Sequence, residues 1–379
     1  MTKRSIKLAF SLLLIFAMTA LTLTSVSAPA TSDSLPCISV ITPMGGHISG
    51  VSASDIRMSS RNIKDAKLYV GGFPFGVKFM TDGVIVVGLC EINTTVGAVN
   101  PARDAGLRQN DVILKVGGAT IADAASLTHA AEICGGKALE IVYSRDGNEA
   151  VTTLTPALCK DDGKYKTGMY VRDSGAGIGT VTYVIPETLS FGGLGHGICD
   201  SDTGKLIPMQ RGSVVGVTIN GVVKGLSGTP GEVKGYFSSG KTGTLLKNTD
   251  CGVFGAFVSM PSDITPTLLP IGTRNEVKCG KAYIMSTLNG TCPQKYEIEI
   301  SDIRQSSTTN KCFTVKVTDK ALLDKTGGII QGMSGSPIIQ NGKLVGAVTH
   351  VLINDPTTGY GIFIENMLNA AQIPMARAS

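Results

Sequence analysis

The hexapeptide Gly332-Met333-Ser334-Gly335-Ser336-Pro337 constrains the fold more than any other stretch. Glycines tolerate positive φ and close backbone approach, so the chain can bend tightly around an exposed serine. Such a bend aims the backbone N–H groups of Gly332 and Ser334 at one point, where they can stabilise the oxyanion of an acyl-transfer intermediate. The next residues, 338–348, read as a hairpin with Asn341-Gly342 at its tip, the favoured type I′ pair. A plain Gly/Ser turn between two strands is the alternative reading of these six residues.

Composition supports a fold rich in strands and tight turns. The 379 residues include 47 glycines, 16 prolines and no tryptophan, and 42% are hydrophobic, enough for two or three domains with buried cores. The net charge of +5 is spread along the chain. Because no block of Lys and Arg alternates with aromatic residues, we expect no nucleic-acid partner.

The nine cysteines form no C-x-x-C pair, which excludes zinc-ribbon and thioredoxin motifs. We therefore expect no metal site and no cofactor. Disulfides among the four cysteines from Cys251 to Cys312 remain open, with small buried thiols as the alternative.

The N-terminus has the pattern of an export signal. Basic residues precede an apolar run at residues 8–23, and Val26-Ser27-Ala28 resembles a small-residue cleavage site. We expect residues 1–28 to be a signal peptide or a retained signal anchor, and residues 29–65 to be a linker or irregular segment.

Residues 66–157 resemble a PDZ domain. Asn100 to Val116 is similar to the P-A-x-x-A-G-L-x-x-G-D-x-I segment of bacterial protease PDZ domains, and residues 123–134 read as the helix of the peptide groove. PDZ domains bind a peptide by strand addition and hold its terminal carboxylate on backbone N–H groups. We predict that the peptide-binding loop contains Gly72, Phe73, Phe75, Gly76 and Val77.

The chain from residue 160 to 379 is rich in strands and punctuated by glycines, with Asn220-Gly221 as a further expected hairpin tip and a last helix at residues 364–371. A serine nucleophile needs a base beside it. Of the four histidines, His47 lies outside the recognisable domains and His129 falls on the expected PDZ helix. His196, between two glycines upstream of Ser334, is the favoured base, and His350 reads as a structural histidine.

The C-terminal stretch around Ser334, with Thr349-His350-Val351 after it, closely resembles the SpoIVB serine peptidases of endospore-forming bacteria. Leu194 to Ile198 resembles the histidine motif of that family. The resemblance implies a mainly β chain: a small α+β PDZ domain followed by a chymotrypsin-like double β-barrel peptidase domain at residues 160–379. It also implies Ser334 as nucleophile, His196 as base, Asp319 as orienting acid, and Gly332 and Ser334 as oxyanion hole. Asp200, Asp202 and Asp250 stay open as alternative acids.

The resemblance further implies an exported endopeptidase that acts between the forespore and mother-cell membranes. Its expected partner is a membrane-bound inhibitor of an intramembrane protease, whose cleavage lets a late sigma factor mature, and it is expected to cut itself near the N-terminus. The alternative is an exported PDZ adaptor whose peptidase fold is inert or secondary.

Overall fold

A computed structural model describes residues 66–201 and 203–371. The expected export signal (1–28), the linker (29–65) and Asp202 therefore lie outside the described residues. Within the described ranges, no helix combines the length and the apolar character needed to cross a membrane.

Six strands form a first barrel. Antiparallel pairing runs from β2 to β11, β12, β15, β14, β13 and back to β2, which closes the ring. Strand β13 continues through Asn220-Gly221 with only a shift in register, so the predicted hairpin tip there is wrong. The barrel strands and their two neighbours are β1 (Lys67–Val70), β2 (Pro74–Leu89), β11 (Met169–Val184), β12 (Ser190–Gly193), β13 (Met209–Val223), β14 (Glu232–Thr249), β15 (Gly252–Phe257) and β16 (Thr267–Pro270).

A second closed barrel follows in the chain, in the order β17-β18-β19-β22-β21-β20. The predicted hairpin after Ser334 is confirmed, because Asn341 and Gly342 join β20 to β21 with φ of 50° and 75°. The last predicted helix is also confirmed. The elements are η3 (Arg274–Glu276), β17 (Gly280–Ser286), β18 (Gln294–Ser301), β19 (Phe313–Val317), α4 (Lys320–Thr326), β20 (Pro337–Gln340), β21 (Lys343–Leu352), β22 (Asp355–Phe363) and α5 (Ile364–Ala371).

The α+β elements expected of a PDZ domain have a core of their own, which includes Ile113, Leu127 and Ile141. Helix α3 begins with a capping box, in which Asp123 accepts from the Ser126 amide and Ser126 from the Asp123 amide. The elements are β3 (Ile92–Thr94), β4 (Gly97–Val99), α2 (Pro101–Asp104), β5 (Val112–Val116), β6 (Ala119–Thr120), α3 (Ala124–Ile133), β7 (Leu139–Arg145), β8 (Asn148–Leu154), β9 (Ala157–Leu158) and β10 (Tyr165–Lys166).

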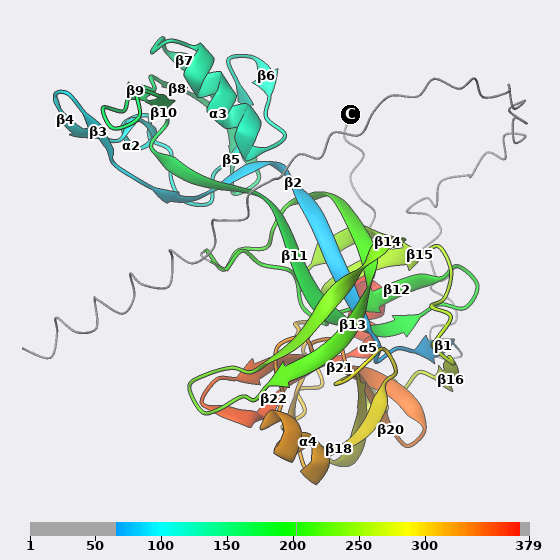
Figure 1. The fold of residues 1–379 in the computed structure, drawn as a ribbon. Coiled ribbons are helices and arrows are strands. Elements are labelled where there is room, and N and C mark those ends of the chain that lie inside the picture. The colour runs from blue at the N-terminus through cyan, green and yellow to red at the C-terminus, as the bar shows by residue number, and fades with distance from the viewer. Residues whose placement is uncertain (1–65, 202, 372–379) are drawn as a thin grey trace, which may run out of the picture. The chain divides into compact units, whose positions relative to one another are not determined.

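Two long strands belong to both the first barrel and the PDZ elements. The first half of β2 pairs with β13, and its second half pairs with β5 at Val84 and Ile85. Strand β11 pairs with β2 from Met169 to Thr180 (Figure 1). The PDZ elements are therefore inserted between two strands of the first barrel. Tyr69, Val70 and residues 74–81, which the sequence assigns to the PDZ segment, pair with barrel strands.

The predicted peptide-binding loop must be corrected for the same reason. Phe73, Phe75 and Val77 are at most 3% exposed and lie in the core of the first barrel. A Cβ at Gly76 would come within 2.6 Å of Phe237 and Val215, and one at Gly72 within 2.7 Å of the Met285 side chain. An apolar residue at every second position makes this run a barrel strand, so it offers no loop to a peptide.

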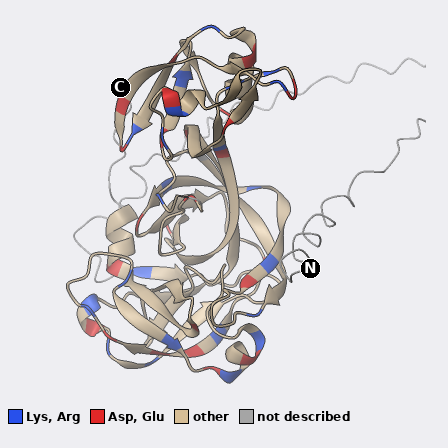
Figure 2. Cartoon of the chain, turned by 90° about the vertical axis from the view of Figure 1, so that its left-hand side faces the viewer, with Lys and Arg blue, Asp and Glu red and all other residues tan. Residues whose placement is uncertain are grey.

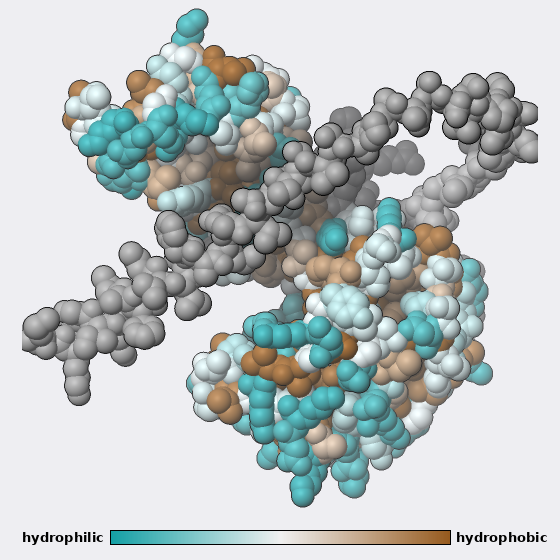
Figure 3. Space-filling model, viewed as in Figure 1, coloured by the Kyte–Doolittle hydropathy of each residue, from teal (hydrophilic) through white to brown (hydrophobic). Residues whose placement is uncertain are grey.

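Charges of both signs are interspersed along the described chain (Figure 2). On the face drawn in Figure 3, polar residues cover most of the surface and apolar residues lie in small groups between them.

Candidate active site

The turn around Ser334 is held by a strand of the other barrel. The Thr180 hydroxyl of β11 donates to the Gly332 carbonyl at 2.7 Å, and the Thr180 amide donates to the Ser334 carbonyl at 3.1 Å. The Thr182 hydroxyl donates to the Gly335 carbonyl at 2.7 Å. Because alternate side chains of a strand share one face, the Thr-Val-Thr pattern places both hydroxyls against the turn. The second barrel thus carries the serine, and the first barrel fixes its backbone.

The backbone N–H groups of Gly332 and Ser334 have no hydrogen-bond acceptor within the described residues, whereas their neighbours in the turn do. Gly332 adopts φ of 95°, which favours glycine. Two adjacent donors that are left unused beside a nucleophile are what an oxyanion hole requires. The neighbouring amides that do find carbonyl acceptors are those of Gln331, Met333, Gly335 and Ser336.

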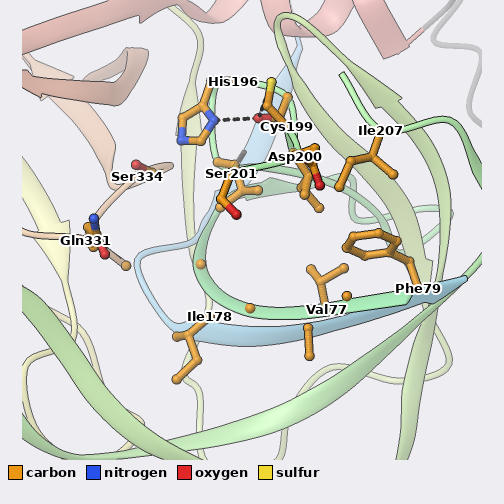
Figure 4. Close-up of a pocket in the computed structure, with 18 of the residues that line it drawn as sticks. Val77, Phe79, Ile178, His196, Cys199, Asp200, Ser201, Ile207, Gln331 and Ser334 are labelled. Atoms are coloured by element: carbon orange, nitrogen blue, oxygen red, sulfur yellow. Dashed lines mark hydrogen bonds between the residues drawn. The ribbon is translucent and has the colours of Figure 1, made fainter. Parts of the chain in front are cut away.

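His196 enters the same cleft from the first barrel, after β12. Leu194 and Gly195 both adopt positive φ to make the turn, and a Cβ at Gly195 would lie 2.9 Å from Thr349 Cγ2 of β21. The Nδ1 atom of His196 lies 2.8 Å from the Gly197 carbonyl oxygen. A carbonyl oxygen only accepts, so Nδ1 carries the proton and Nε2 is the basic nitrogen. Nε2 lies on the side of the ring that faces Ser334 (Figure 4).

Burial sets the protonation of His196. Desolvation lowers the pKa of its imidazole below the usual range, and the hydrogen bond to Gly197 opposes that shift. The ring is therefore neutral at pH 7, as a general base must be.

His350 lies beside His196, which the sequence did not indicate. The two ring centroids are 4.8 Å apart, and His350 Nδ1 is buried without a hydrogen-bond partner. Burial, followed by the charges of His196 and Lys311, lowers the pKa of His350 to about 4. The preceding residue, Thr349, accepts a 2.8 Å hydrogen bond from the Ser334 hydroxyl through its carbonyl oxygen. His350 is thus part of the site, although the sequence suggested a structural role.

The structure does not support Asp319 as the orienting acid. One carboxylate oxygen accepts from the Leu322 amide at 3.0 Å and caps α4, and the other accepts from the Glu297 amide at 3.2 Å. An aspartate directly before a helix is a favoured N-cap, which explains its position. In the described part of the chain, the group that orients His196 is the Gly197 carbonyl.

The other candidate acids are placed differently. Asp200 is buried and forms an ion pair with Arg172. Asp250 lies exposed in the turn between β14 and β15, where its backbone carbonyl accepts from the Asn310 side chain.

Ser334 and His196 open onto one cleft of about 690 Å³ (Figure 4). Its walls come mostly from the first barrel, and its remaining lining comes from the turn around Ser334 and from His350. The first-barrel residues include Val77 and Phe79 of β2, the β11 residues Ser174 to Gly179, and Ile198, Cys199 and Ile207. Within the described residues no group of three or more His, Cys, Asp or Glu side chains could hold a metal ion.

This cleft lies inside the segment that a family model matches. The model for the SpoIVB peptidase S55 family matches residues 163–368, more than half of the chain. The chain belongs to the SpoIVB peptidase S55 family. A second model, for the PDZ domain, matches residues 59–155. The predicted mainly β fold, with a PDZ domain and a barrel-containing serine endopeptidase domain, is therefore confirmed.

Comparisons with curated proteins and with solved structures add little to the family assignment of this S55 peptidase. No curated protein matches the chain. Among solved structures, the crystal structure of Rv3671c protease from M. tuberculosis in its active form is similar at 16% identity, covering 54% of this chain and 76% of that chain, with a TM-score of 0.32. We draw nothing further from so distant a similarity.

The geometry fits acyl transfer by this S55 peptidase. With a peptide carbonyl oxygen at the Gly332 and Ser334 N–H groups, the Ser334 hydroxyl would have to turn from Thr349 toward His196. In that arrangement Nε2 could take the hydroxyl proton as Oγ attacks the carbonyl carbon, and could later give a proton to the leaving amine. Hydrogen bonds of this kind often form fully only once substrate is bound.

Proposed function

We propose that this S55 peptidase is an exported sporulation protease that cleaves a membrane-associated regulator of an intramembrane protease, and also cuts itself near the N-terminus. The observation that carries the proteolytic part is the convergence of Ser334, His196 and two unused backbone N–H groups in one cleft. The family description supports the sporulation part.

The N-terminal pattern supports the export part of the proposal. The basic end, the apolar run at residues 8–23 and the Val26-Ser27-Ala28 site support export, with residues 1–28 either cleaved or retained as an anchor. We propose the space between the forespore and mother-cell membranes as the location, and a peptide segment of a protein partner as the occupant of the PDZ groove.

The test compares wild-type protein with the Ser334→Ala variant, both recovered from sporulating cells. Mass spectrometry of the mature N-terminus should show a cut beyond residue 28 in the wild type and none in the variant. Sporulation should stop in the variant at the stage where the late mother-cell sigma factor matures. Identical N-termini together with normal sporulation would instead favour the exported PDZ adaptor with an inert peptidase fold.

A further inference from the structure

One edge of β11 has no strand partner over most of its length. From Met169 to Thr180 the strand pairs with β2 along one edge, and β1 continues that edge at Tyr183 and Val184. Along the other edge, pairing with β12 begins only at Val181. Among the described strands, none pairs with the other edge before Val181. At Thr180 the backbone N–H donates to the Ser334 carbonyl and the C=O accepts from the Leu194 amide, so the groups available to an added strand lie before Thr180.

The same stretch of β11 borders two cavities in succession. Met169, Tyr170 and Val171 line a groove of about 410 Å³ together with Leu127, Thr128 and Ala131 of α3. Asp173 accepts a 2.9 Å hydrogen bond from the Ala124 amide and so fixes the first turn of α3 beside the strand. Ser174 to Gly179 then line the catalytic cleft. The groove between a helix and a strand is where PDZ domains add a peptide strand.

Packing explains two of the glycines in this stretch but not the third. A Cβ at Gly175 would lie 2.5 Å from the Phe79 ring, and one at Gly179 would lie 2.2 Å from Leu194. A Cβ at Gly177 would meet nothing within 4 Å, although Gly177 lines the cleft. A glycine inside a strand often marks a place where another backbone comes close. The open space at Gly177 leaves room for such a backbone.

The required proton transfer gives the direction in which a substrate chain would run beside β11. His196 must protonate the leaving nitrogen, so the substrate on the carboxyl side of the scissile bond starts beside His196, on the first barrel. A chain that continues along β11 from Gly179 toward Met169 runs opposite to that strand, which is the orientation an antiparallel ladder needs.

We propose that β11 is a single continuous track for the leaving-group side of the substrate. The substrate segment that follows the scissile bond pairs with the free edge of β11 and ends in the groove between β11 and α3. The track from Gly179 to Met169 spans roughly 33 Å at the usual rise of a strand, so the groove receives residues about 10 positions after the cut. This inference rests on the proposed proteolytic function and adds a rule about where the enzyme cuts.

The experiment uses the full chain and peptides based on one cleavage site mapped in β-casein. Each peptide keeps six residues before the scissile bond and carries 2, 5, 8, 11 or 14 residues after it. In the wild type, kcat/KM should rise at least tenfold between the 5-residue and the 14-residue peptides. In Gly177→Trp, which places a ring on the track, this ratio should fall close to one. Gly221→Trp is the matched control, because Gly221 also lies in a strand with open space around its Cβ position, and it should keep the wild-type ratio.

A second pair of variants tests the far end of the track. Thr128→Arg fills the groove and should remove the gain from the last residues only, whereas Ile133→Arg, at an exposed position of α3 outside the groove, should not. Fluorescence anisotropy of the same peptides on Ser334→Ala protein reads binding without turnover.

The outcomes separate the two proposals. Cleavage that does not depend on the length of the leaving-group side, or affinity for Ser334→Ala that does not depend on it, overturns the track and leaves the peptidase assignment intact. If the wild type leaves β-casein intact, peptides of the same lengths from one fixed β-casein segment still measure binding to the Ser334→Ala protein. Length-dependent binding without any cleavage overturns the proposed function and leaves the track.

Discussion

The imidazole rings of His196 and His350 lie 4.8 Å apart, centroid to centroid, with their planes inclined by 35°. One ring comes from the first barrel and the other from β21 of the second. Two positive charges at this separation repel, and burial adds to the cost. Both rings are therefore neutral near pH 7, so the base beside Ser334 is ready to accept a proton.

This pair predicts a loss of stability in acid. The pKa of His350 is about 4 in the folded protein, against 6.5 ordinarily, because of burial and the charges of His196 and Lys311. As pH falls from about 6.5 to 4, the imidazole of residue 350 takes up a proton in the unfolded chain but resists it in the folded protein. The contribution of His350 to stability is therefore full above this window and is lost across it. The free energy of unfolding, measured in urea, should decrease less for His350→Gln than for the wild type between pH 6.5 and 4.5. The control is exposed His129→Gln, which should follow the wild type; equal slopes in all three proteins would contradict the prediction.

Replacing the nucleophile should separate chemistry from folding. Ser334→Ala removes one hydroxyl that lines the cleft and should lower kcat by roughly 10⁶-fold while the protein remains folded, as loss of a nucleophile does in other serine peptidases. Ser336 is the matched control. Its hydroxyl is fully buried without a partner, so Ser336→Ala should keep activity within a few-fold. Peptide hydrolysis measures the activity of each variant, and circular dichroism on the same preparations shows whether it is folded.

Asp319→Ala tests whether Asp319 orients His196. Because Asp319 is the N-cap of α4, this replacement should cost about 1 kcal/mol of stability and leave kcat nearly unchanged in protein that is still folded. An orienting acid would instead cost about 10⁴-fold in kcat. A loss of that size in a stable Asp319→Ala protein would restore Asp319 to the triad.

Gly335 is expected to be the least replaceable residue of the turn. A Cβ there would lie 2.1 Å from the Thr180 carbonyl oxygen and 2.4 Å from the Leu194 amide, in a residue with φ of 93°. Gly335→Ala must therefore separate the two barrels locally, and we expect both activity and several degrees of thermal stability to be lost. Gly342→Ala carries similar backbone strain, at φ of 75°, with open space around the Cβ, and should cost only about 1 kcal/mol. Similar melting temperatures for the two variants would contradict the role of this contact.

Local patterns predicted local structure well. The hairpin at Asn341-Gly342, the helix at residues 364–371 and the groove helix at residues 124–133 follow from turn chemistry, capping and periodicity. The turn around Ser334 and its two free N–H groups follow from glycine spacing in the same way.

Long-range relationships were not predictable from those patterns. Apolar alternation at residues 73–79 identifies a strand but not the sheet that receives it. The sequence alone therefore predicts a PDZ loop where the structure has a strand of the first barrel. His350 reads as a core residue in the sequence, because its contact with His196 joins elements more than 150 positions apart. Asp319 matched a family position, but its carboxylate is used by its own helix and by Glu297.

The insertion of the PDZ elements between β2 and β11 also affects when the enzyme can become active. Strand β2 pairs with residues that lie 80 to 106 positions further along the chain, and contacts of such long range form late in folding. The catalytic cleft then needs Thr349 and His350 of β21, which follow β2 by more than 250 residues. A nascent chain therefore lacks a complete cleft until β21 has been made, so the order of the segments itself delays proteolysis.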